Sequence, residues 1–141
     1  MEHDRATQRL WATVHRITRR RLKFYADAED ISVGAAASRL VRAGFDRHAE
    51  VDRDRETWRR ETFREFYFLP PAPPEGEGVR VKVALEPGDI ERVRALAEAE
   101  FEIEPTILNR LILWGFKKVP RNDRYEAAWN ADFWRRHESR T

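Results

Sequence analysis

The stretch Val79-Arg80-Val81-Lys82-Val83-Ala84-Leu85 alternates between apolar and mostly polar side chains. A period of two and a high content of valine predict a β-strand with one buried face. Pro87 follows almost directly and suits the first turn of a helix, and Asp89 is favourable near the positive end of that helix. We therefore expect a strand at 79–85 that is followed at once by a helix.

Two apolar stripes at helical spacing follow this strand. The first stripe consists of Ile90, Val93, Leu96, Ala97 and Phe101. The second begins after Pro105 and consists of Ile107, Leu108, Leu111, Ile112 and Phe116. Each stripe predicts a helix with one apolar face, and Pro120 marks the end of the second. Residues 79–119 are thus expected to form a strand, a helix, a short turn and a second helix.

The same pattern occurs earlier in the chain, 71 residues upstream. Tyr25-Ala26-Asp27-Ala28-Glu29 recurs as Leu96-Ala97-Glu98-Ala99-Glu100, and Ser38-Arg39-Leu40-Val41 recurs as Asn109-Arg110-Leu111-Ile112. Gly44-Phe45 likewise recurs as Gly115-Phe116. Internal repeats indicate the architecture, and two copies favour a closed pair about a pseudo-two-fold axis over an open array.

The first copy agrees with the second in its helices. Asp30 is a tolerable turn residue, because Asp visits the left-handed backbone region more readily than most residues. Ser32 can cap the second helix. The offset places the first strand at Gln8 to Val14, with Val14 pairing near 81–85. A continuous helix is the alternative, because Leu10, Val14, Ile17 and Leu22 also fit helical spacing.

These patterns divide the chain into four parts. Residues 1–49 and 79–119 are the two repeated units. Residues 50–78 form a connector that is charged, then aromatic, and ends in a stiff run of prolines and a flexible Glu-Gly segment. Residues 120–141 carry Tyr125, Trp129 and Phe133 at intervals of four, which predicts a helix over 123–137 with one aromatic face.

A strand followed by two helices, with this apolar spacing, resembles the ribbon-helix-helix fold of Arc- and MetJ-type DNA-binding proteins. The residues that carry the resemblance are the alternating strand, Pro87, Leu96-Ala97 and the stripe from Ile107 to Phe116. The resemblance implies a mainly α fold with a short β-ribbon, in which a tandem pair of units forms a pseudo-dimer, with extra helices. Two copies in one chain are similar to the tandem members of that family, which include accessory proteins of conjugative plasmids.

In that family the open face of the ribbon enters the DNA major groove, and the amino ends of the second helices hold phosphates. Carried over by position, the residues that would contact bases are Arg80, Lys82, Ala84, Arg9, Trp11 and Thr13. The residues that would contact phosphates are Ser32 and Thr106, together with a basic cluster at Arg19, Arg20, Arg21 and Lys23. Arg80 and Lys82 suit guanine, while Ala84 could touch only a thymine methyl group.

The two copies differ where phosphates would bind. Glu100, Glu102 and Glu104 crowd the start of the second helix in the second copy, and Pro105 removes a backbone donor there. Carboxylates at this position would repel a phosphate. We therefore expect the two halves to engage DNA unequally.

Composition argues against several other classes of protein. The chain has no cysteine, so disulfides and thiolate chemistry are excluded. The four histidines are scattered without metal-ligand spacing, and no glycine-rich phosphate loop is present. We expect no enzymatic activity, no cofactor and no metal. No apolar run is long enough for a membrane span, and a cytoplasmic location is expected.

The sequence thus leads to two hypotheses. The first is a sequence-specific double-stranded DNA-binding protein, acting as a transcriptional repressor or as a plasmid or phage accessory factor. The second is a protein-interaction module on the same scaffold, with weak or lost DNA binding, using the aromatic segments 58–69 or 125–134. It is motivated by the net charge of only +2 and by the acidic residues near 98–104. A tandem ribbon would be complete as a monomer, whereas loss of the first strand would require a homodimer.

Overall fold

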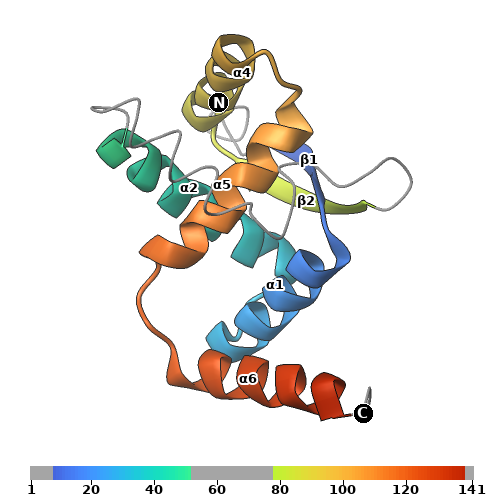
Figure 1. The fold of residues 1–141 in the computed structure, drawn as a ribbon. Coiled ribbons are helices and arrows are strands. Elements are labelled where there is room, and N and C mark those ends of the chain that lie inside the picture. Colours follow the sequence, from blue (N-terminus) through green and yellow to red (C-terminus); the bar gives the residue numbers. More distant parts are fainter. Residues whose placement is uncertain (1–7, 52–77, 139–141) are drawn as a thin grey trace.

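The computed structural model describes residues 8–51 and 78–138 of the 141. Residues 52–77 of the connector expected at 50–78 lie outside the described residues, and they include the whole aromatic segment 58–69. The described chain contains a pair of strands and five helices (Figure 1). In chain order these are β1 (Gln8–Val14), α1 (Arg16–Glu29), α2 (Val33–Val51), β2 (Val79–Leu85), α4 (Pro87–Glu100), α5 (Glu104–Lys118) and α6 (Asp123–Glu138).

Strands β1 and β2 form a two-stranded antiparallel sheet. The strand expected at 8–14 is therefore confirmed, and the continuous helix that was its alternative is excluded. Trp11 lies opposite Lys82 at the centre of the ribbon, and Val14 lies opposite Val79 at one end. The expectation that Val14 pairs near 81–85 was wrong, because antiparallel pairing brings the end of β1 against the beginning of β2.

The 71-residue offset of the sequence is also the offset of the structure. Shifting β1 by 71 residues gives the bounds of β2, and shifting α1 by 71 gives the bounds of α4. The pairing of the strands agrees with this offset, because Trp11 and Lys82 lie opposite each other and occupy equivalent positions in the two copies. After α1 and α4 the chain turns through the equivalent residues Asp30 and Phe101, both left-handed with φ of 61° and 55°. The turn residue expected at Asp30 is confirmed.

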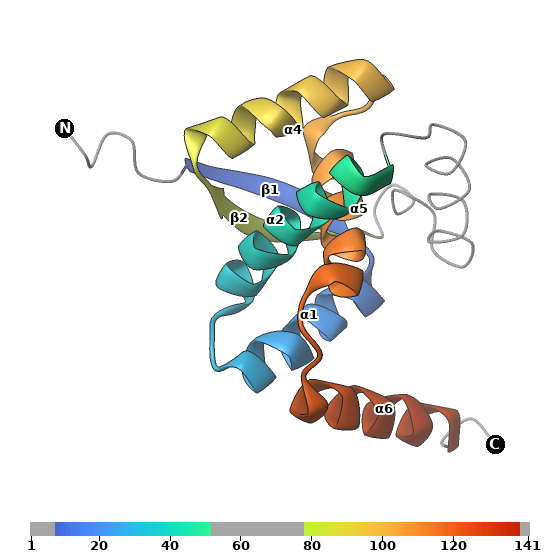
Figure 2. The same cartoon turned by 90° about the vertical axis from the view of Figure 1, so that its left-hand side faces the viewer.

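One face of the ribbon is buried under helices. Ala12, Val14, Val83 and Leu85 are fully buried, and α2 and α5 lie on their side of the ribbon (Figure 2). In the same view α4 lies above α2 and α5, and α1 lies below them. The alternation in both strands thus decides which face is covered by helices and which is left open.

Helices α2 and α5 cross in close contact at two equivalent glycines. A Cβ atom at Gly44 would lie 2.2 Å from the carbonyl oxygen of Leu111, and one at Gly115 would lie 2.1 Å from that of Leu40. Leu40 and Leu111 are again 71 residues apart. The two contacts are therefore equivalent within the repeat, and both depend on the absence of a side chain.

The apolar stripe expected in the first helix of the second copy is correct for all but its last member. Ile90, Val93 and Ala97 are buried, whereas Phe101 is 96% exposed. The expectation for Phe101 was wrong, because α4 ends at Glu100 and the left-handed turn points the next side chain away from the core. Helical periodicity does not extend past the helix end.

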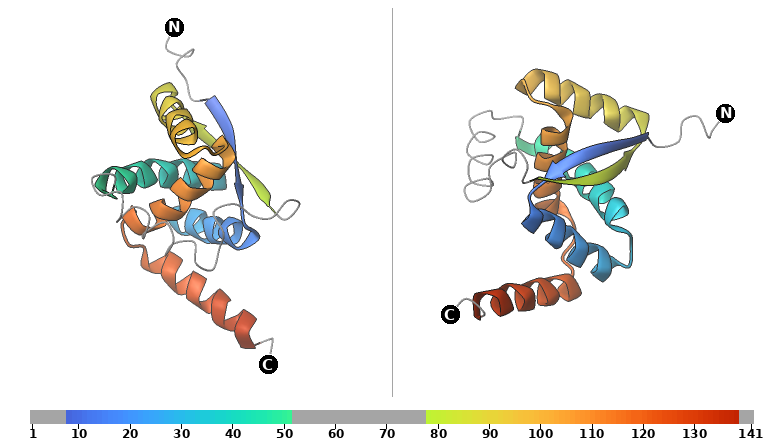
Figure 3. Two further views of the ribbon diagram at one scale, coloured as in Figure 1. Left: turned by 45° about the horizontal axis from the view of Figure 1, so that its top comes forward. Right: turned by 90° about the vertical axis from the view of Figure 1, so that its right-hand side faces the viewer.

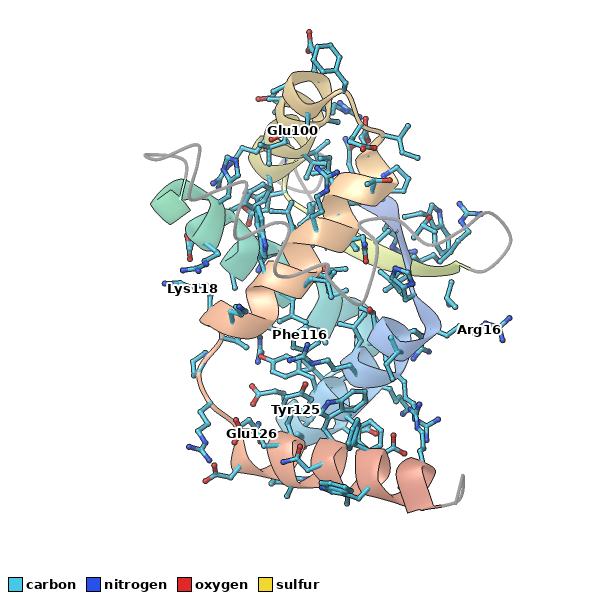
Figure 4. The ribbon with its side chains drawn as sticks, viewed as in Figure 1. Arg16, Glu100, Phe116, Lys118, Tyr125 and Glu126 are labelled. Carbon is cyan, nitrogen blue, oxygen red and sulfur yellow. The ribbon has the colours of Figure 1, made fainter. Side chains whose placement is uncertain are left out.

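Helix α6 packs against α1 at the opposite end of the molecule from α4 (Figure 1). Trp129 meets Phe24 edge to face, with ring centroids 5.7 Å apart. Tyr125 stacks on Phe116 and meets Tyr25 edge to face, and Figure 4 shows it pointing from α6 towards Phe116. The helix expected at 123–137 is confirmed by α6, although Phe133 remains 46% exposed. None of the described helices has the length and apolarity needed to cross a membrane.

Candidate nucleic-acid interface

The outer face of the ribbon carries all six residues that were predicted to contact bases. Arg9, Trp11, Arg80 and Lys82 are exposed, while Thr13 and Ala84 are half-buried. In the right-hand view of Figure 3 the ribbon lies in front of α2 and α5, with this face towards the viewer. The register makes cross-strand pairs of these positions, listed along the ribbon as Arg9 with Ala84, Trp11 with Lys82 and Thr13 with Arg80.

Trp11 holds the two cations of the opposite strand. The guanidinium carbon of Arg80 lies 4.4 Å from the centroid of the Trp11 ring, and the ammonium nitrogen of Lys82 lies 5.3 Å from it. Cation–π contacts of this kind contribute about 0.5–1 kcal/mol at exposed sites. Trp11 can therefore keep both cations on the ribbon face, a positioning role that the sequence alone does not reveal.

The amino end of α2 lies beside β2. The Oγ atom of Ser32 accepts a hydrogen bond of 3.1 Å from the backbone N–H of Ala35, which confirms the expected helix cap. Within the same helix, the hydroxyl of Ser38 accepts a 2.9 Å bond from the N–H of Ala84 on β2. Backbone N–H groups of a first helical turn have no partner within the helix, and here Ser32 accepts from those of Ala35 and Ala36. The donors that this end of α2 can offer close to the ribbon are therefore those of Val33 and Gly34.

The amino end of α5 is poorer in donors. Pro105 has no N–H, whereas the equivalent residue of α2 is Gly34. The next two N–H groups are occupied at both helix starts, those of Thr106 and Ile107 by Ile103 and those of Ala35 and Ala36 by Ser32. Thr106 is only 5% exposed, so its hydroxyl presents little surface to a ligand. Two carboxylates also lie here, Glu102 paired with Arg110 at 3.2 Å and Glu104 near Arg94 at 3.7 Å. The start of α5 thus differs from the start of α2 in its two carboxylates and in one missing backbone donor.

The basic residues of α1 have different surroundings. Arg21 donates to the hydroxyl of Tyr125, and its guanidinium lies 3.9 Å from the Phe116 ring centroid, so it is held where α1, α5 and α6 meet. Lys23 pairs with Asp27 at 3.1 Å on the surface. Arg19 is half-buried and makes no ion pair with any residue in the described ranges. The basic residues predicted to contact phosphates therefore do not share the same surroundings.

Arg20 takes part in a partly buried ion pair with α6. Its Nε and Nη2 atoms donate to the two carboxylate oxygens of Asp132 at 2.9 and 2.6 Å. Asp132 is 1% exposed and also accepts from Arg136 at 3.0 Å. The hydrogen bonds from Arg20 lower the pKa of Asp132 to about 2, against the opposing effect of burial. This carboxylate stays charged and ties α6 to α1.

Several residues of this region were not predicted from the sequence. Asp132 and Arg136 lie on α6 and meet α1 only in the folded chain, more than a hundred positions from Arg20. Burial raises the pKa of Tyr125, so its phenol remains a neutral acceptor for Arg21. The aromatic spacing in 123–137 indicated a packed helix, but nothing in it indicated an acidic residue facing the arginines of α1.

Within the described ranges, no three or more histidines, cysteines or carboxylates are grouped in a way that could hold a metal ion. Comparisons with models of protein families, with curated proteins and with solved structures found no match.

Proposed function

We propose that this protein binds double-stranded DNA sequence-specifically by inserting the β1–β2 ribbon into the major groove, on a tandem ribbon-helix-helix scaffold. The observation that carries the proposal is the outer face of the ribbon, where Trp11 contacts both Arg80 and Lys82. A seven-residue ribbon is roughly 23 Å long, and the major groove is about 12 Å wide and admits two paired strands. A repressor or an accessory factor at a plasmid or phage origin would use this activity.

Each part of the surface has a distinct chemical role in this proposal. Arg80 and Lys82 can donate to the O6 and N7 atoms of guanine, and Ala84 and the methyl group of Thr13 can meet thymine methyl groups. Arg9 extends the same face towards the beginning of β1. The amino end of α2 offers backbone donors to a phosphate. Thr106 is left out of the proposed contacts because its side chain is buried.

The experiment begins with selection of bound sites from a random duplex library by the full chain. On the selected site, Arg80→Ala should weaken binding by about 1–3 kcal/mol, roughly 5- to 150-fold, and relax the preference at one base pair. Arg124→Ala is the matched control, since Arg124 is an exposed arginine on α6 and its loss removes the same charge. If Arg80→Ala with Lys82→Ala left affinity and preference unchanged, insertion of the ribbon would be ruled out.

A second candidate function is docking of another protein at the turn between α4 and α5. Phe101 and Ile103 are 96% and 65% exposed there, and Phe101 has a left-handed backbone that few large residues adopt. Strain together with exposure of a large apolar side chain favours a contact outside the chain. This alternative predicts weak DNA binding with a shallow dependence on salt, whereas several phosphate contacts predict a steep one.

A further inference from the structure

A basic hollow of about 800 Å³ lies where α1 begins, next to the end of the ribbon. Five cationic side chains line it together with Val79 of β2, namely Arg16, Arg19, Arg20, Lys23 and Arg136. Val79 pairs with Val14, so the hollow adjoins the end of the ribbon at which β1 leads into α1. Figure 4 shows Arg16 pointing outwards from the first turn of α1.

The charge in this hollow is only partly neutralised. Asp132 binds Arg20 and Arg136, and Asp27 binds Lys23. Arg16 and Arg19 have no ion pair within the described residues. Three positive charges therefore remain when two carboxylates are set against five cations. The first turn of α1 has no acidic residue and no side-chain cap, so the positive end of the helix adds to this field.

The start of α4, which is the equivalent helix of the second half, lacks these two arginines. The positions 71 residues after Arg16 and Arg19 are Pro87 and Ile90, and Ile90 is buried. The first turn of α4 contains Asp89 instead of a basic residue. The helix start at one end of the ribbon is therefore basic and the helix start at the other end is not, although the backbone is repeated.

We propose that this hollow binds the phosphodiester backbone of DNA on one side of the segment contacted by the ribbon. The inference rests on the proposed function and adds a second, one-sided contact to it. Arg16 and Arg19 supply guanidinium groups that form no ion pair with the part of the chain that the structure describes. Arg20 is held by Asp132 while half of its side chain stays exposed. Arginine suits this role because its planar group can donate two hydrogen bonds to one phosphate. The bound duplex should therefore extend further beyond the Val14–Val79 end than beyond the other.

The test uses the full chain with both arginines replaced, Arg16→Gln and Arg19→Gln. The control variant carries Arg121→Gln and Arg124→Gln, which removes the same charge from exposed positions just before α6 and in its first turn. Each protein is titrated with the selected site in three duplexes, one short, one extended on the left and one extended on the right. Circular dichroism confirms that each variant is folded.

We expect one extension to strengthen binding of the wild type and of the control, and this gain to be lost in the Arg16/Arg19 variant. Base preference should not change, because the ribbon is intact. Each lost phosphate contact removes about 0.9 from the slope against salt, so the advantage of the wild type on the extended duplex should shrink about tenfold between roughly 50 and 200 mM salt. Equal gains from both extensions, or a gain that survives in the variant, would overturn the proposal.

The proposed DNA contacts of the ribbon and of the hollow are tested separately. If Arg80 and Lys82 prove unimportant, the hollow is tested on random-sequence duplex, where the Arg16/Arg19 variant should still bind more weakly than the control. Equal binding by these two variants would reject the hollow while leaving the result for the ribbon intact. If the wild type binds no duplex DNA, both proposals are rejected.

Discussion

We predict that a side chain at either glycine of the α2–α5 crossing destabilises the fold, and the prediction rests on two distances. In Gly115→Ala the new Cβ atom would lie 2.1 Å from the carbonyl oxygen of Leu40, and in Gly44→Ala it would lie 2.2 Å from that of Leu111. Ordinary contacts of this kind begin at 3.4 Å. The obstacle is backbone in both cases, so no rotamer change relieves the overlap and the helices must separate by roughly 1.2–1.3 Å.

The cost of that separation can be bounded. Overpacking a core costs about 1–3 kcal/mol, and a clash with rigid backbone belongs near the upper end of this range. A gap of about 1 Å also forfeits up to half of the dispersion attraction between the atoms it separates, here the buried leucines of the crossing. The higher helix propensity of alanine raises the free energy of unfolding by about 1 kcal/mol and offsets part of this loss. We therefore expect each substitution to lower the free energy of unfolding by about 2 kcal/mol.

Urea-induced unfolding followed by circular dichroism measures this change. Gly88→Ala is the matched control, because Gly88 lies in α4 with nothing within 4 Å of its added Cβ. It should leave stability unchanged or raise it by up to about 1 kcal/mol. Gly44→Ala with Gly115→Ala should cost less than the sum of the single changes, because one separation relieves both contacts. Additive losses, or a Gly115→Ala protein as stable as the Gly88→Ala protein, would refute the close crossing.

Two further predictions concern the ion pair on α6 and the turn after α4. Because the pKa of Asp132 is about 2 in the folded chain and about 3.9 in an unfolded one, the stability that its ionisation provides is fully present above pH 4 and is lost as the pH falls towards 2. The stability difference between wild type and Asp132→Asn, measured by denaturant unfolding across this range, should accordingly narrow below pH 4; a difference independent of pH would contradict the assignment. Phe101→Gly should raise stability by about 1 kcal/mol, because it removes left-handed strain and loses no packing at a side chain that is 96% exposed. Phe101→Ala keeps the strain and should be close to neutral in the same assay, so equal effects of the two changes would argue against strain at this turn.

The candidate interface was only partly predictable from the sequence. Alternation in 79–85 indicated that Arg80 and Lys82 share an outer face, because side chains of a strand alternate regardless of what the strand pairs with. The contact of both with Trp11 depends on the register between β1 and β2, which periodicity within one strand does not specify. The roles of Arg20 and Arg21 could not be predicted either, since their partners Asp132 and Tyr125 lie on a helix more than a hundred residues away.

The sequence by itself determined the order of strand, helix and helix in the second copy and the two helices of the first, because periodicity and proline positions act locally along the chain. The strand at 8–14 was decided by the structure, since its apolar residues also fit helical spacing. The sequence also determined that the two helix starts differ in charge, since Glu102, Glu104 and Pro105 have no counterparts in the first copy. Only the tertiary structure decided that Trp11 lies between two cations and that α6 meets α1. These contacts join distant residues, and the sequence does not specify their geometry until the helices pack. The alternating stretch at 79–85 thus predicted a ribbon face, and folding placed a basic hollow next to the end of the ribbon where α1 begins.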